Sequence, residues 1–88
     1  MNERLEEKVS VITVYNSTKG TVFPWKLKWH DRLYAIDIIG YHYKVTKGAI
    51  LYHFYTVSSG STAFKLRLDT SNLHWTLEEL YDATADQS

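Results

Sequence analysis

The pattern that most constrains the fold of this chain lies in residues 23–39. Large apolar side chains occupy every second position at Phe23, Trp25, Leu27 and Trp29. A period of two is typical of a strand with one buried face. His30 and Asp31 then form a two-residue connection, which pairs Trp29 with Arg32 and starts a second strand. The segment therefore predicts a β-hairpin with an aromatic face.

The same register can be followed along both strands of this hairpin. It places Leu27 opposite Tyr34 and, if the second strand continues to Gly40, Phe23 opposite Ile38. Gly40 lacks a side chain and favours a bend or bulge at that point. We expect the aromatic face to form one core with later strands, made of Trp25, Trp29, Trp75, Phe64 and Leu66.

Other parts of the chain also have strand character. β-branched or alternating runs are found at residues 9–15, 41–45, 50–57 and 62–69. A second hairpin is predicted around residues 46–49, where pairing Val45 with Ile50 would place His42 opposite His53. Short strands with frequent turns and no long helix predict an all-β antiparallel meander of five to six strands. Curling into a small, SH3-like, partly open barrel would remove most sheet edges.

The last element of this meander is ambiguous. As a strand, Trp75 and Leu77 continue the alternation; as a helix, Thr76 and Glu79 form a capping box. We favour a strand through Leu77 followed by a short C-terminal helical turn.

Composition places the chain in the class of small single domains. We divide it into a charged N-terminal extension or helical turn (1–8), one β domain (9–81) and a polar tail (82–88). There is no cysteine, so a disulfide framework is excluded. No apolar run approaches the roughly 20 residues of a membrane helix. These features predict a cytoplasmic protein without a membrane partner.

Charge gives a weaker indication. Ten basic residues balance ten acidic ones, which is unlike a dedicated nucleic-acid binder. The basic residues occupy the middle of the chain and acidic residues crowd both ends. We therefore expect a basic outer sheet surface with acidic terminal segments, in the simplest case as ordinary solvated faces.

A family resemblance rests on residues spread over 22–82. Pro24, Trp29, Arg32 and Tyr34 are followed by an F-x-L-x-L-D run at 64–69 and by W-x-L at 75–77. This pattern resembles a small bacterial all-β domain family of unknown function, in which some members are associated with translesion-polymerase proteins. The resemblance implies a small stand-alone β domain and little about activity.

Candidate chemical groups are few. The four histidines, His30, His42, His53 and His74, do not have the spacing of a metal motif. His42 and His53 could share a metal if they face each other, but a zinc site needs three or four ligands, so two ordinary strand histidines are the simpler interpretation. The serines at 58–61 lack the strand-turn-helix context of a nucleophile. We predict no enzyme activity, no catalytic residue, no metal and no cofactor.

A binding surface is easier to support. Tyrosines and cations gather in and beside the second hairpin: Tyr41, Tyr43, Lys44, Lys47, Tyr52, Tyr55, Lys65 and Arg67. Exposed aromatic side chains on a small domain often mark contacts. These residues predict a non-catalytic module that contacts a protein partner, or a second copy in a homodimer. The alternative is a single-stranded nucleic-acid-binding module in DNA or RNA metabolism, because aromatic rings beside lysines can stack bases.

Overall fold

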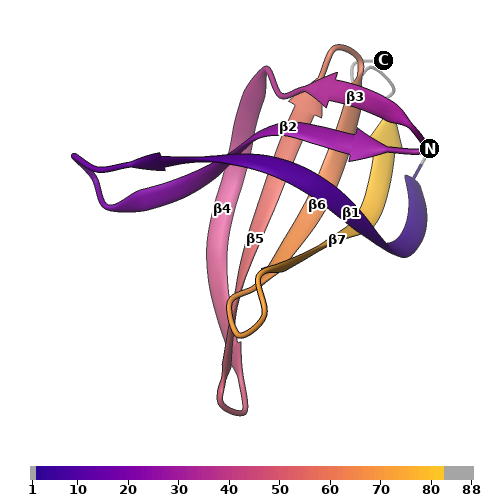
Figure 1. The fold of residues 1–88 in the computed structure, drawn as a ribbon. Coiled ribbons are helices and arrows are strands. Elements are labelled where there is room, and N and C mark those ends of the chain that lie inside the picture. The colour runs from indigo at the N-terminus through magenta and orange to yellow at the C-terminus, as the bar shows by residue number, and fades with distance from the viewer. Residues whose placement is uncertain (1, 83–88) are drawn as a thin grey trace.

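The computed structural model describes residues 2–82, which form one antiparallel sheet (Figure 1). Its strands are β1 (Asn2–Asn16), β2 (Thr21–Trp29), β3 (Arg32–Ala35), β4 (Ile38–Lys47), β5 (Ile50–Ser59), β6 (Thr62–Asp69) and β7 (His74–Asp82). They are ordered β3-β2-β1-β7-β6-β5-β4. The predicted all-β, partly open barrel is confirmed, but the described residues hold seven strands rather than five or six.

The long strand β1 joins the two parts of the sheet. Its first half pairs with β7 as far as Val9 opposite Trp75, and its second half pairs with β2 from Ser10 opposite Lys28. Residues 2–8, expected to be an extension or a helical turn, are therefore part of a strand. Figure 1 shows the β1–β2 hairpin crossing the face of β4 and β5. The hydroxyl of Tyr55 in β5 donates to the Val22 carbonyl of β2, at 2.7 Å.

The predicted register of the first hairpin is correct near its turn. Trp29 pairs with Arg32 and Leu27 with Tyr34. However, β3 ends at Ala35, so the expected pairing of Phe23 with Ile38 is wrong. After Ala35 the backbone passes from β2 to β5, because the Ile36 amide donates to Trp25 and the next amide donates to Ser58. The bend expected at Gly40 is present as a bulge in the pairing of β4 with β5.

The second hairpin is formed in a different register from the predicted one. Lys47, not Val45, pairs with Ile50, and Gly48 and Ala49 make the turn. Gly48 has a φ of 60°, a conformation that glycine adopts without steric cost. Gly48 and Ala49 therefore form a two-residue turn. Each residue next to it in β4 pairs with a β5 residue two positions further along the chain than predicted.

The C-terminal element is a strand through Asp82, so the predicted helical turn is wrong. Leu77 pairs with Leu66, and both side chains are fully buried. A register shift between Lys65 and Leu66 keeps Leu80 opposite Phe64 on the core side. Alternating burial therefore outweighs the local capping signal. Residues 83–88 of the predicted tail lie outside the described residues. Among residues 2–82, no helix has the length and hydropathy needed to cross a membrane.

The core lies between the concave face of β5–β7 and the overlying β2–β3 hairpin. Its buried residues are Leu27, Tyr55, Val57, Phe64, Leu66, Leu68, Trp75 and Leu77. Trp29 is half-buried and packs against them, as predicted. Trp25 does not belong to the core: it is 49% exposed, and the Lys26 ammonium lies 4.7 Å from the centre of its ring. The bulge between Ile12 and Thr13 interrupts the alternation at this end of the hairpin.

Replacement of Phe64 with alanine tests this core. Phe64 is fully buried, so Phe64→Ala should lower the free energy of unfolding by about 3–5 kcal/mol. Trp25→Ala should cost below about 1 kcal/mol, because surface positions contribute little. Urea unfolding followed by circular dichroism measures both values. A larger loss for Trp25→Ala than for Phe64→Ala would contradict this core assignment.

Candidate functional site

The outer side of β4–β6 carries a continuous aromatic surface. We call it the tyrosine face, and it consists of Tyr41, Tyr43, Tyr52, Phe54, Lys65 and Arg67. Tyr55 and Val57 of β5 are buried, so the alternating Phe54 points to the opposite side. Tyr43 pairs with Phe54, and their rings stack at 5.0 Å with an interplanar angle of 8°. Tyr41 and Tyr43 are 71% and 41% exposed.

The eight residues of the predicted contact surface are not all on this face. Five of them lie on it: Tyr41, Tyr43, Tyr52, Lys65 and Arg67. Lys47 lies at its end and lines a hollow of about 210 Å³ together with Val45, Tyr52, Phe54, Arg67 and Glu78.

Two residues of the predicted surface lie elsewhere, and one member of the tyrosine face was missed. Tyr55 lies in the core, with 2% of its surface exposed. Lys44 pairs with His53 on the concave side. Phe54 was not predicted, although the alternation along β5 places it in phase with Tyr52 and out of phase with Tyr55.

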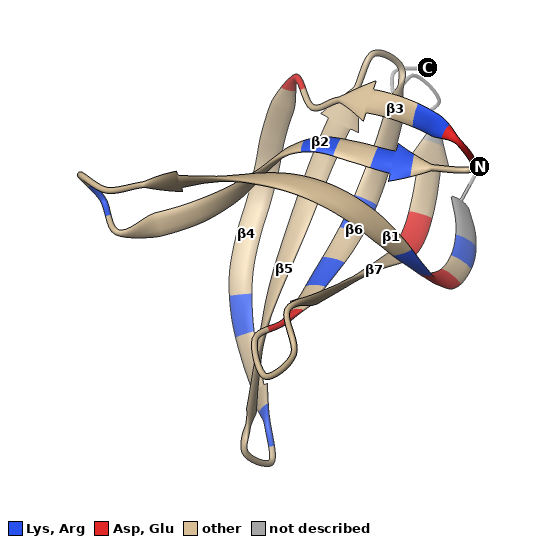
Figure 2. Cartoon of the chain, viewed as in Figure 1, with Lys and Arg blue, Asp and Glu red and all other residues tan. Residues whose placement is uncertain are grey.

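The two cations of the tyrosine face are already paired with carboxylates. Arg67 contacts Glu78 at 2.5 Å and Glu6 at 3.4 Å, and Lys65 lies 3.8 Å from Glu78. Both cations also lie over aromatic rings of β5, at 5.6–5.9 Å from the ring centres. Figure 2 shows the basic positions of β6 beside acidic positions of β7. Two cations of the predicted basic sheet surface, Lys65 and Arg67, are therefore neutralised by carboxylates of the terminal strands β1 and β7.

The histidine pair lies on the concave side of β4 and β5. His42 is opposite Tyr55 rather than His53, but the two imidazoles meet diagonally, with His42 Nε2 2.7 Å from His53 Nδ1. The His42 ring also stacks on Tyr55 at 4.3 Å. Desolvation by burial, followed by the charge of Lys44, lowers the pKa of His42. The pKa of His53 is lowered by desolvation, then by His42 and Lys44. Within residues 4–81, no three His, Cys, Asp or Glu side chains are grouped as metal ligands.

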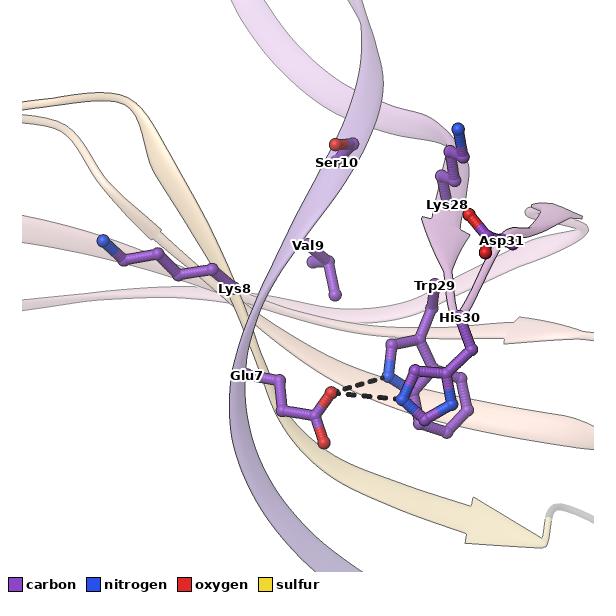
Figure 3. Close-up of a pocket in the computed structure, with 8 residues that line it drawn as sticks. All are labelled: Glu7, Lys8, Val9, Ser10, Lys28, Trp29, His30 and Asp31. Carbon is purple, nitrogen blue, oxygen red and sulfur yellow. Dashed lines mark hydrogen bonds and ion pairs between the residues drawn. The ribbon is translucent and has the colours of Figure 1, made fainter.

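A second hollow, of about 350 Å³, lies where β1 passes the turn between β2 and β3 (Figure 3). We call it the Glu7 pocket; it is lined by Glu7, Lys8, Val9, Ser10, Lys28, Trp29, His30 and Asp31. Glu7 Oε1 accepts a hydrogen bond from Trp29 Nε1 at 3.0 Å and lies 3.4 Å from His30 Nε2. The His30 ring stacks on Trp29 at 4.1 Å.

The backbone around the Glu7 pocket is unusual. Four non-glycine residues of the described chain have a positive φ: Glu6, His30, Asp31 and Leu73. Glu6 adjoins the pocket, and His30 and Asp31 line it. Such conformations cost L residues about 1–3 kcal/mol and are concentrated at functional sites. Sequence reasoning missed this pocket because Glu7 was assigned to the extension, 22 residues before its hydrogen-bond partner Trp29.

Comparisons with protein-family models, with curated proteins and with solved structures found no significant match. The resemblance to a small bacterial domain family therefore stays a prediction.

The histidine pair should make stability depend on pH. The unfolded chain takes up protons at these rings below about pH 6.5, whereas the folded protein, with both pKa values lowered, resists protonation. The free energy of unfolding should therefore fall as the pH decreases from 7.5 to 5.5. Urea unfolding at both values measures the fall, and His53→Gln should reduce it. The matched variant His74→Gln should leave it unchanged, and equal falls in all three proteins would contradict the prediction.

A substitution in the turn between β2 and β3, which lines the Glu7 pocket, should make the protein more stable. Asp31 has a φ of 60°, a conformation that costs a residue with a side chain about 1–2 kcal/mol. Glycine avoids this cost, but its greater flexibility in the unfolded chain lowers the free energy of unfolding by about 0.5–1 kcal/mol. Asp31→Gly should therefore raise the free energy of unfolding by about 0.5–1 kcal/mol. Urea unfolding measures the gain. Arg32→Gly, one residue further in β3, should destabilise, and a loss in both variants would show that Asp31 is not strained.

Proposed function

We propose that this protein is a non-catalytic interaction module that contacts another protein through the tyrosine face. The observation that carries the proposal is an exposed aromatic surface whose cations are already paired with carboxylates. Aromatic residues are enriched at protein interfaces, and charged residues are depleted at their centres. A neutral aromatic surface fits a protein partner better than a polyanion.

The position of β4 supports the same proposal. β4 is an edge strand, and its exposed apolar side chains include Ile38 and Tyr41, which are 63% and 71% exposed. An edge strand offers unpaired backbone groups to an added strand. A partner segment lying along β4 would therefore gain backbone hydrogen bonds and contact Tyr41 and Tyr43. A second copy of the chain is one such partner, as a homodimer.

The second candidate function is binding of a single-stranded nucleic acid. It is favoured by the stacked Tyr43 and Phe54 rings and by Lys47 at the end of the tyrosine face. Each stacked base contributes about 1–3 kcal/mol. Against it, Lys65 and Arg67 would have to give up Glu78 before they could neutralise a phosphate. We therefore rank it below a protein partner.

A paired binding experiment tests the proposal. Proteins retained from lysate by the immobilised domain should be lost with the double variant Tyr41→Ala, Tyr43→Ala. They should remain with Tyr15→Ala, which removes a 65% exposed tyrosine of β1 outside the tyrosine face. Retention should change little between 50 and 200 mM salt, because few ions are released from a neutral surface.

An NMR titration with a short mixed-sequence oligonucleotide separates the two candidates. Shifts on the tyrosine face that weaken steeply with salt would favour nucleic acid, because each phosphate contact releases counterions. If neither the oligonucleotide nor a retained protein depends on Tyr41 and Tyr43, the proposal is wrong.

A further inference from the structure

The Glu7 pocket places a carboxylate where the fold would be better served by an apolar side chain. Glu7 pairs with the fully buried Leu77, on the side of the sheet that carries the core. A carboxylate beside an apolar layer loses hydration, which costs free energy unless it gains partners. Glu7 keeps 41% of its side-chain surface exposed, toward the pocket. An aliphatic residue at this position would extend the core instead.

The surrounding backbone departs from what folding favours as well. A bulge between Arg4 and Glu7 includes Glu6 at a φ of 53°. The turn at His30 and Asp31 uses left-handed conformations in both residues, for which Asn-Gly is the preferred pair. Three unfavourable choices therefore meet at one pocket. Departures of this kind are expected where binding, rather than stability, determines the sequence.

The groups that converge in the pocket define the chemistry of its ligand. Oε1 of Glu7 is engaged by Trp29 and His30, whereas no hydrogen bond among residues 4–81 involves its Oε2. In Figure 3, the Lys8 and Lys28 side chains extend away from the Glu7 carboxylate, and the planar Trp29 and His30 rings lie beside it. A carboxylate next to flat aromatic rings suits a planar cation and repels an anion.

We propose that the Glu7 pocket binds a guanidinium group. A guanidinium donates two parallel hydrogen bonds to one carboxylate and stacks on aromatic rings. An ammonium ion is more strongly hydrated and gains less in an open pocket. His30 is the internal partner of Glu7, and the ligand takes its place at the carboxylate. This site is on a different part of the molecule from the tyrosine face and does not depend on the proposed function.

NMR titration with N-acetyl-arginine amide tests this site. The indole Nε1–H signal of Trp29 reports directly on the Glu7 carboxylate and should shift, together with the amides of His30 and Asp31. N-acetyl-citrulline amide has the same shape without the charge and should cause no shift up to the same concentration. Glu7→Gln keeps an oxygen that accepts from Trp29 but removes the charge, so binding should weaken at least about tenfold. Glu79→Gln removes a charge on another surface and should bind like the unchanged protein.

The source of the guanidinium is tested by a second ligand. A peptide with one arginine between glycine and serine residues should bind more tightly than the amide if the natural ligand is an arginine side chain of a protein. Equal affinity would indicate a free small molecule with a guanidinium group. The proposal is overturned if arginine and citrulline amides give the same response, if neither causes a shift at 50 mM, or if binding persists in Glu7→Gln.

Discussion

The division of β1 between two partners is the constraint on which the rest of the fold depends. Its first half pairs with β7, and its second half carries β2 and β3 over the concave face of the sheet. Without that change of partner, Leu27 could not reach Phe64 and Leu66. A sheet of this size cannot bury its apolar face alone, because one side remains open to water. The β2–β3 hairpin closes that side and so creates the core.

Bulges make this change of partner sterically acceptable. One lies between Arg4 and Glu7 and another between Ile12 and Thr13, on either side of the point where β1 passes from β7 to β2. Each bulge increases the local twist and bends the strand. Pro24 pairs with Thr13 at the second bulge, where its missing N–H interrupts no regular ladder. The unusual φ of Glu6 is thus part of the bend that also directs Glu7 toward Trp29.

Local sequence patterns predicted the strands of this fold better than they predicted which residues pair between strands. The register at His30 and Asp31 was correct because a two-residue turn fixes the pairs next to it. The second hairpin was placed two residues out of register because residues 41–55 carry aromatic side chains on both faces, so burial does not specify one pairing. For the same reason the sequence did not show that Tyr55 lies in the core, where its hydroxyl donates a hydrogen bond to the Val22 carbonyl.

The candidate sites were the least predictable parts because they depend on long-range pairing. In the sequence, Glu7 belongs to a charged N-terminal segment. Only the pairing of β1 with β7 places it on the side of the sheet that carries the core. The same pairing decides the electrostatics of the tyrosine face: Glu6 and Glu78 come from opposite ends of the chain and meet at Arg67. Charges that are separated in the sequence therefore neutralise each other in the sheet. These pairs leave little unpaired positive charge beside the aromatic side chains of the tyrosine face. Association at such a surface is governed by shape and apolar contact rather than by long-range attraction.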